Sequence, residues 1–286
     1  MTEGESVESR SPEQALDIDV AAHNRRLDVL GYTMIPGFLD PDRAEGLRSR
    51  AIELHAEVKA TPGRAAPRPE LEGVVPNLQN YDRMFIDILS DVRLEALLMP
   101  RLNDPYYAPI PADAPNYILG ELIARSSTKA LPLHLDSWMP AAGNQTWMVQ
   151  VVFALEDRDE AEGCSVVVPG SHQSGSYPDR QLETVHPVPV RTGDLVIWDS
   201  RLWHASRDRT SARPGWIVLA TFQRWWVKPR FDIPGGVPDA IYASLSDRQK
   251  ALLGYCSVPP LDDTHGPKQG YEWADRNRLA MGRRAR

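Results

Sequence analysis

Cysteine is scarce in this 286-residue sequence, and long apolar runs are missing from it. Cys164 and Cys256 form neither a CxxC pair nor a zinc-ribbon spacing, so the fold needs no disulfide framework. No window approaches the roughly eighteen apolar residues that a membrane span requires, and the start lacks the basic and apolar stretches of a signal peptide. We therefore expect a cytoplasmic protein without a membrane-spanning segment.

Positive charge is not in excess either. The formal net charge is -7, whereas a protein that binds a nucleic-acid duplex needs a basic stripe to displace counterions. This charge gives no reason to expect a nucleic-acid partner. The composition, with 42% hydrophobic and 25% charged residues, is typical of a globular protein with a buried core.

The first hundred residues carry helical periodicity after a polar start. Residues 1–14 are acidic and polar and are predicted to form a disordered tail, which leaves 15–286 as one domain. Pro41 follows Asp40 as a favourable first helical residue. Apolar spacing predicts helices over 16–30, 41–58 and 81–99. The segment 61–79 is rich in Pro and Gly and is predicted to be a long loop.

Short β-rich runs separated by turns dominate the middle of the chain. The predicted strands are 116–124, 147–155, 164–168, 195–198 and 216–224. Many short strands with polar turns are typical of a sandwich or barrel, of which the jelly roll is one form. We expect a mainly β fold with a core over about 105–228 and the N-terminal helices packed on it. The remaining 229–286 is predicted to be loop-rich, with one helix at 246–253.

A His-x-Asp motif, His134 and Asp136, is the main candidate for chemistry. On a strand, residues two apart point to the same side, so both side chains could approach one ion. His204 is the best candidate for a third ligand. Two imidazoles and one carboxylate on one face leave the opposite positions open, which suits ferrous iron in oxygenases. The same three ligands could also hold zinc with an open water position.

Several blocks around this motif resemble the phytanoyl-CoA dioxygenase (PhyH) family. They are Leu133-His-Leu-Asp-Ser-Trp138, Gln150-Val-Val-Phe-Ala-Leu155, Glu162-Gly-Cys-Ser-Val-Val-Val-Pro-Gly-Ser-His172 and Trp203-His-Ala-Ser206. The resemblance implies a double-stranded β-helix core with iron held by His134, Asp136 and His204. It also implies Fe(II), 2-oxoglutarate and O2 as cofactors, and a small-molecule substrate.

The expected anchor for the far carboxylate of 2-oxoglutarate departs from the family pattern. An arginine usually stands about eleven positions after the distal histidine, where this sequence has Gly215. Arg213 lies two residues earlier and would share the face of position 215 on an extended segment, so we predict that it binds the carboxylate. Alternative sources of the anchor are Arg209, Arg207 and Arg125.

The resemblance assigns further residues to the pocket. Ser206 resembles a position that hydrogen-bonds the same carboxylate, and Gln150 lies on a strand that lines the pocket in the family. Trp138, two residues after Asp136, should point into the same cavity if the strand continues. It could contact the substrate or pack in the core.

The predicted activity is hydroxylation of a C–H bond, with release of succinate and CO2. Related halogenases carry Gly or Ala where this sequence has Asp136, which argues against halogenation. The segments 61–79 and 229–245 are candidates for covering the substrate. The alternatives are a zinc-containing or non-catalytic jelly-roll protein that binds a small molecule.

Overall fold

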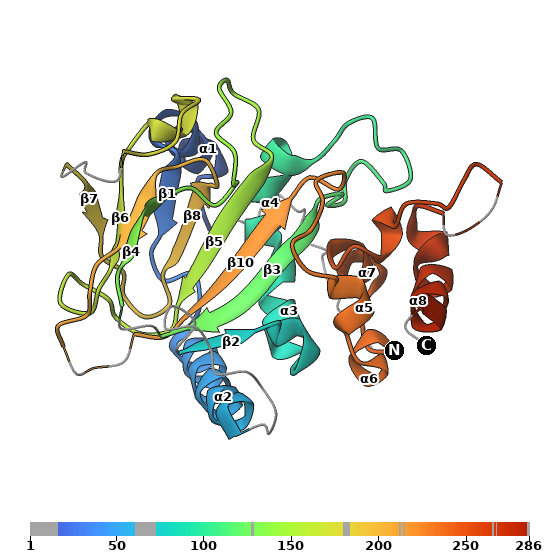
Figure 1. Cartoon of the computed structure of the whole chain (residues 1–286), viewed down its shortest axis with the longest axis horizontal. Coiled ribbons are helices and arrows are strands. Elements are labelled where there is room, and N and C mark those ends of the chain that lie inside the picture. The colour runs from blue at the N-terminus through green and yellow to red at the C-terminus, as the bar shows by residue number, and fades with distance from the viewer. Residues whose placement is uncertain are drawn as a thin grey trace, which may run out of the picture.

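Two antiparallel sheets form the centre of the protein (Figure 1). The computed structural model describes residues 17–60, 73–126, 129–179, 184–211, 213, 215–264, 266 and 268–284; the predicted tail lies outside them. In sheet order, the larger sheet contains β1 (Tyr32–Ile35), β8 (Leu195–Asp199), β5 (Met148–Ala154), β10 (Ile217–Gln223), β3 (Ile118–Arg125) and β2 (Val74–Pro76). The smaller sheet contains β4 (Leu131–His134), β9 (His204–Ser206), β6 (Ser165–Val167) and β7 (His186–Val188).

Alternate residues of the central strands serve two different cores. Along β5, Val151 and Phe153 belong to the main hydrophobic cluster, whereas Val152 and Ala154 belong to a second one. Since successive side chains of a strand point to opposite faces, the nearly unbroken apolar sequence of β5 reflects burial on both faces. The second cluster includes Val167 of the smaller sheet. The two sheets therefore pack face to face, and the predicted mainly β, jelly-roll core is confirmed.

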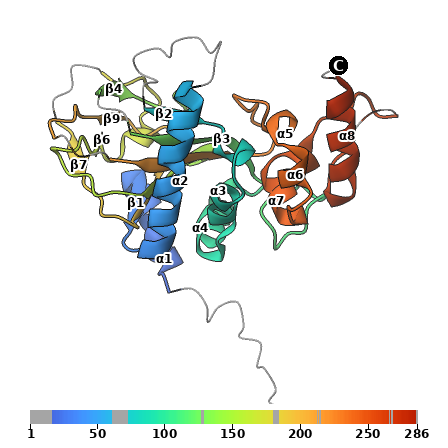
Figure 2. The ribbon, with the colours of Figure 1, turned by 90° about the horizontal axis from the view of Figure 1, so that it is seen from below.

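Helices cover the face of the larger sheet that is turned away from the smaller one (Figure 2). They are α1 (Val20–Leu30), α2 (Pro41–Ala60), α3 (Met84–Asp87) and α4 (Val92–Leu102). Helix α2 begins at Pro41 as predicted, and it buries the positions that helical spacing selects: Ala44, Leu47, Ala51 and Leu54. The predicted N-terminal helical layer is thus present.

The helix predicted over 81–99 is interrupted before α4. Asp91 adopts an extended backbone, and its carboxylate accepts a hydrogen bond from the N–H of Arg93 at 2.9 Å. An aspartate in this position caps a new helix rather than continuing the preceding one. Short 3-10 turns lie at Leu78–Asn80, Ile88–Ser90, Ser171–Gln173, Tyr255–Ser257 and Tyr271–Trp273.

The C-terminal segment is richer in helix than the sequence predicted. It contains α5 (Ile233–Gly236), α6 (Asp239–Tyr242), α7 (Asp247–Leu252) and α8 (Ala274–Arg284), gathered beyond the β3 side of the larger sheet (Figure 1). The sequence predicted only one of these helices, because several of them are too short to show apolar periodicity. The predicted helix at 246–253 corresponds to α7, which Ser246 caps with Gln249.

The main hydrophobic cluster joins distant parts of the chain. It runs from Leu27 in α1 through the larger sheet to Ala274 in α8. Of the predicted loop 61–79, residues 61–72 lie outside the described residues, and Val74–Pro76 forms the edge strand β2. No helix in the described part of the chain is long and apolar enough to cross a membrane.

Candidate metal centre and cavity

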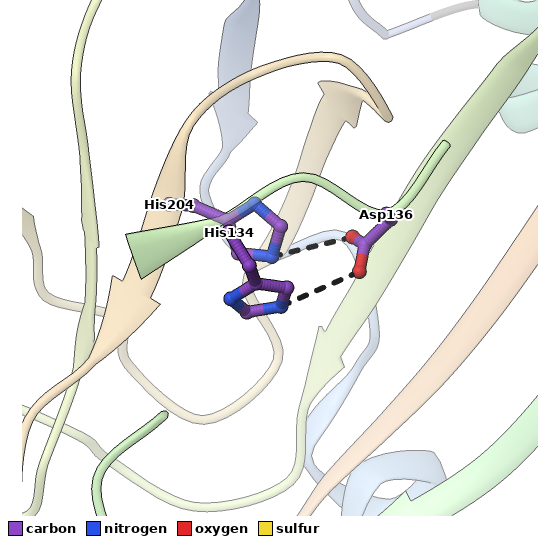
Figure 3. Close-up of side chains that lie close together, drawn as sticks. All are labelled: His134, Asp136 and His204. Atoms are coloured by element: carbon purple, nitrogen blue, oxygen red, sulfur yellow. Dashed lines mark ion pairs between the residues drawn. The ribbon is translucent and has the colours of Figure 1, made fainter. Parts of the chain in front are cut away.

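His134, Asp136 and His204 meet at one end of the smaller sheet (Figure 3). His134 ends β4 and His204 begins β9, and the two residues are direct partners in the antiparallel register. Asp136 lies in the turn after β4, where its backbone N–H donates to the carbonyl of Ser200 at 2.8 Å. One ligand atom from each of the three residues lies within 4.8 Å of the other two. The structure therefore brings together the three predicted metal ligands.

Both imidazoles are held in the same orientation by their own backbone. Nδ1 of His134 lies 2.8 Å from the carbonyl oxygen of Pro132, and Nδ1 of His204 lies 2.9 Å from that of Leu202. A carbonyl only accepts hydrogen bonds, so each Nδ1 carries the proton and each Nε2 has a free lone pair in the neutral ring. The Nε2 atoms point to the Asp136 carboxylate, at 3.6 Å for His134 and 3.2 Å for His204. This donor set fits a ferrous ion.

The charges of the triad favour an ionised carboxylate. Burial would raise the pKa of Asp136, but the charge of His204 and the hydrogen bond from His134 outweigh it and lower the pKa to about 2. Burial also opposes protonation of His134, but the hydrogen bond and charge of Asp136 outweigh it and raise its pKa. For His204 burial prevails and lowers the pKa. Near neutral pH, the site thus offers one carboxylate and at least one neutral imidazole.

The triad opens into a large cavity between the two sheets. Its volume is about 1860 Å³, and residues of β3, β5 and β10 line it together with residues of β4 and β9. Apolar side chains such as Ile123, Leu133 and Leu219 make up part of the wall. The volume exceeds the roughly 300–1,000 Å³ of ordinary ligand pockets, which leaves room for two organic molecules at once.

Three of the predicted pocket residues line this cavity. Gln150 is buried on β5, and its Oε1 accepts a hydrogen bond from Thr221 Oγ1 at 2.8 Å. Ser206 follows His204 on β9, and its Oγ accepts a hydrogen bond from the N–H of Leu131 at 3.0 Å. The third, Trp138, lies in the turn beyond β4 rather than on a continued strand.

Trp138 is exposed at the cavity rather than packed in the core. Its backbone has a φ of 65°, which is uncommon for a residue with a side chain, and 67% of the residue is exposed. The guanidinium of Arg230 lies 5.2 Å from its ring centroid. This contact places an aromatic face and a cation side by side on the cavity lining.

Arg213 does not line the cavity, which corrects the expectation for this residue. Its Nη2 donates to Oε1 of Glu162 at 2.6 Å, and its side chain is 68% exposed. The Glu162 side chain is only 2% exposed, so its carboxylate requires a counter-ion, and Arg213 provides it.

The alternative arginines differ in their placement. Arg207 pairs with Glu160 at 2.9 Å, and Arg209 donates to Ser126 Oγ at 3.1 Å; neither lines the cavity. Arg125, at the end of β3, is half-buried and does line it. Of the four arginines considered from the sequence, Arg125 alone therefore faces the cavity.

The structure adds charged residues that sequence reasoning missed. Arg158 and Glu121 line the cavity, and Arg230 Nη1 lies 3.7 Å from the Glu121 carboxylate. Burial raises the pKa of Glu121, against the lowering effect of Arg230. Glu121 lies on the predicted strand β3, but no motif marks it or Arg158 in the sequence. Only the folded arrangement assigns them to the cavity.

Comparison with known proteins places the chain in a family. Residues 27–214 match the sequence profile of the phytanoyl-CoA dioxygenase (PhyH) family. A curated relative, "Dioxygenase af480" from Aspergillus fumigatus, is 26% identical over 246 residues, covering 84% of this chain and 77% of the relative.

Solved structures share the fold. HygX from Streptomyces hygroscopicus, with nickel and 2-oxoglutarate bound, is 20% identical with a TM-score of 0.56, covering 72% of this chain and 87% of HygX. The 2-oxoglutarate-dependent epimerase SnoN from nogalamycin biosynthesis is 19% identical with a TM-score of 0.53, covering 72% and 82%.

The fold, the triad and these matches together define a class. It is the non-haem iron, 2-oxoglutarate-dependent oxygenases, whose cofactors are iron, 2-oxoglutarate and O2. Within this class, the chain belongs to the phytanoyl-CoA dioxygenase (PhyH) family, as its sequence blocks predicted.

Proposed function

We propose that this protein hydroxylates a C–H bond of a small organic molecule, with His134, Asp136 and His204 holding Fe(II) and with 2-oxoglutarate as the co-substrate. The observation that carries the proposal is the triad itself, in which two oriented imidazoles and an ionised carboxylate face one point in a cavity. Asp136 supports hydroxylation rather than halogenation, because its carboxylate fills the place that a halide would need.

Each residue of the triad has a definable task. The two Nε2 lone pairs and the Asp136 carboxylate would bind iron from one side, which leaves the cavity side for the co-substrate and O2. Bound iron supplies the activation of O2, coupled to oxidative decarboxylation of 2-oxoglutarate. Trp198 Nε1 donates to Asp136 Oδ2 at 3.3 Å, which helps to fix the carboxylate beside the imidazoles.

The cavity walls would orient the two organic molecules. Gln150 and Ser206 present polar groups near the triad, whereas Ile123, Leu133 and Leu219 exclude water from it. For the primary substrate, we assign the side of the cavity at Trp138, Arg230 and Phe231. Aromatic faces and cations there favour a molecule with both apolar and anionic or polar groups.

Residues from both segments that were predicted to cover the substrate line the cavity, which supports that prediction. Gly73, Val74 and Pro76, at the end of 61–79, line the cavity, and Arg230 and Phe231 at the start of 229–245 do so as well. We infer that both segments contact the primary substrate. Substitutions there should change substrate affinity and leave metal binding intact.

The test is formation of succinate from 2-oxoglutarate by protein loaded with Fe(II) under O2. We expect O2-dependent succinate formation in the wild type and none in His134→Ala, Asp136→Ala or His204→Ala. Unchanged turnover in any of these variants would remove that residue from the site. Absence of turnover and of 2-oxoglutarate binding in the wild type, with zinc bound more tightly than iron, would support the zinc alternative.

Product analysis separates hydroxylation from other oxidations of the same class. Hydroxylation adds one oxygen atom to the substrate, and ¹⁸O₂ labels it. The structural neighbour SnoN is described as an epimerase, and an epimerase would return a product of unchanged mass. An unlabelled product of the same mass as the substrate would contradict hydroxylation.

A further inference from the structure

Arg158 occupies the space that a side chain at position 215 would fill. Arg158 lies four residues after the end of β5, and Gly215 lies two residues before the start of β10. A Cβ atom built on Gly215 would lie 3.2 Å from both Cγ and Cδ of Arg158 and 3.3 Å from its Nε. Most real Cβ contacts are longer than this, so the absence of a side chain at 215 allows the Arg158 side chain to lie there.

Arg158 is a buried cation for which the described residues supply no counter-ion. The residue is only 8% exposed, and none of the described carboxylates forms an ion pair with it. Its Nη2 donates to the carbonyl of Gly163 at 2.5 Å, while its buried Nε has no partner in the described part of the chain. A buried charge is costly unless it is paired and hydrogen-bonded. Among the residues that the structure describes, Arg158 therefore lacks an anionic partner.

Neighbouring positive charges increase the need of Arg158 for an anionic partner. Burial lowers the pKa of Arg158, and the positive charges of Arg209 and Arg125 lower it further, to about 10. Arg125 also lines the cavity and has no ion-pair or hydrogen-bond partner among the described residues. It pairs in register with Ile217, two residues beyond Gly215. Two guanidiniums that pair with no described carboxylate thus lie on neighbouring parts of one cavity wall.

Hydroxyl groups connect this wall with the metal centre. Ser165 and Ser206 are direct partners in the pairing of β6 with β9, and both line the cavity together with Arg158. Ser206 lies two residues after the proposed ligand His204. A ligand chelated at the triad could therefore extend along these hydroxyls towards Arg158.

We propose that Arg158, flanked by Arg125, anchors the distal carboxylate of 2-oxoglutarate, in place of a residue at the start of β10. This inference rests on the proposed function, because it takes 2-oxoglutarate as the co-substrate. A guanidinium offers two parallel N–H donors that match a carboxylate, and the Nε of Arg158 is one donor without a partner. The anchor thus comes from the connection after β5, and Gly215 provides the space for it.

Equilibrium binding of two 2-oxo acids tests the assignment directly. 2-Oxopentanoate has the same chelating head as 2-oxoglutarate but lacks the distal carboxylate. Calorimetry on anaerobic, Fe(II)-loaded protein should show that Arg158→Met weakens 2-oxoglutarate binding on the order of 10- to 100-fold, the range of charge-assisted hydrogen bonds. The affinity for 2-oxopentanoate and the iron content should stay unchanged.

Arg207→Met is the matched control, because Arg207 is an exposed arginine paired with the exposed Glu160 outside the cavity. It should bind 2-oxoglutarate like the wild type. If Arg158→Met fails to fold, Arg158→Lys takes its place, since lysine keeps the charge but loses the two-donor fork. Wild-type affinity in the folded Arg158 variant, or an equal loss for both 2-oxo acids, would overturn the assignment.

A positional swap gives a second, independent test. Gly215→Arg alone should weaken 2-oxoglutarate binding, because the new side chain collides with Arg158. Gly215→Arg combined with Arg158→Ala should bind 2-oxoglutarate at least about tenfold more tightly than Arg158→Ala alone. No recovery in the folded double variant would contradict a shared carboxylate site.

These outcomes separate the inference from the proposed function. If the Fe(II)-loaded wild type does not bind 2-oxoglutarate, the proposed function itself fails. If the wild type binds it and the Arg158 variants bind it equally well, only the anchor assignment fails.

Discussion

His134 and His204 are direct partners across two antiparallel strands, and each ring is fixed by the carbonyl two residues before it. Their ring centroids lie 4.2 Å apart. Because both Nδ1 atoms are held by backbone, both Nε2 atoms point towards Asp136 without any side chain to orient them. The register of the smaller sheet therefore preorganises the two imidazoles, and the contacts with Ser200 and Trp198 hold Asp136 opposite them.

Removal of any triad ligand should abolish iron binding. His134→Ala, Asp136→Ala and His204→Ala each leave two ligands. Mutation of a residue that only supports a metal ligand typically lowers metal affinity 10- to 100-fold, so we expect the loss of a ligand to lower it by more than about 100-fold. Iron content after anaerobic loading and desalting measures this. His55→Ala is the matched control, because His55 lines the same cavity but lies outside the triad. Iron retained in a triad variant, or lost in the control, would contradict the assignment.

Metal affinity should rise with pH in the range where His134 loses its proton. The pKa of His134 lies above its ordinary value of 6.5 because Asp136 favours the imidazolium, and a metal binds only the neutral ring. Below that pKa, binding must displace one proton, so affinity falls about tenfold per pH unit. His204 and Asp136, with lowered pKa values, contribute no proton there.

Proton release measured by calorimetry in buffers of different ionisation enthalpy checks this pH dependence. We expect close to one proton per metal ion below pH 6.5, and a declining number as the pH rises through the raised pKa of His134. Release of two protons at pH 6 would show that His204 also titrates there, against the effect of its burial.

Gln150 and Ser206 should contribute less to co-substrate binding than a charged residue does. Gln150→Leu and Ser206→Ala each remove a neutral polar group, and neutral hydrogen bonds contribute about 0.5–1.5 kcal/mol. We therefore expect each variant to weaken 2-oxoglutarate binding by about 2- to 12-fold in calorimetry, with iron content unchanged. Full wild-type affinity in both variants would exclude the two residues from the co-substrate site.

Stability depends on the core between the larger sheet and the helices. Phe153 on β5 is fully buried, and its ring lies 6.0 Å from that of Phe38. Phe153→Ala should lower the free energy of unfolding by about 3–5 kcal/mol, measured by urea denaturation. Val29→Ala, on the exposed face of α1, should change it by less than about 0.5 kcal/mol. A loss below about 1 kcal/mol for Phe153→Ala would contradict its place in the core.

Local patterns predicted the elements that obey simple periodicity. The spacing of Ala44, Leu47, Ala51 and Leu54 predicted α2, and the apolar run 147–155 predicted β5. The spacing of His134 and Asp136 predicted that both side chains lie on one face of a strand. Asp136 instead lies in the turn after β4, where a hydrogen bond from its backbone N–H to the carbonyl of Ser200 holds it beside the ion site.

What the sequence did not predict depends on contacts between distant segments. Arg213 was expected at the cavity, but the buried carboxylate of Glu162, 51 residues away, takes its guanidinium. Arg158 enters the cavity over Gly215 from another strand connection. Tertiary packing decides which carboxylate a given arginine pairs with and where there is room for its side chain. The local spacing of residues in the sequence does not encode either.

The most direct test of the central claim is an anaerobic optical titration of the protein with Fe(II) and 2-oxoglutarate. Chelation of ferrous iron by a 2-oxo acid produces a visible charge-transfer absorption that neither component gives alone. We predict that the wild type develops this absorption to one equivalent of each and that Asp136→Ala does not. No absorption in the wild type, or undiminished absorption in Asp136→Ala, would contradict a 2-oxoglutarate-dependent iron site at His134, Asp136 and His204.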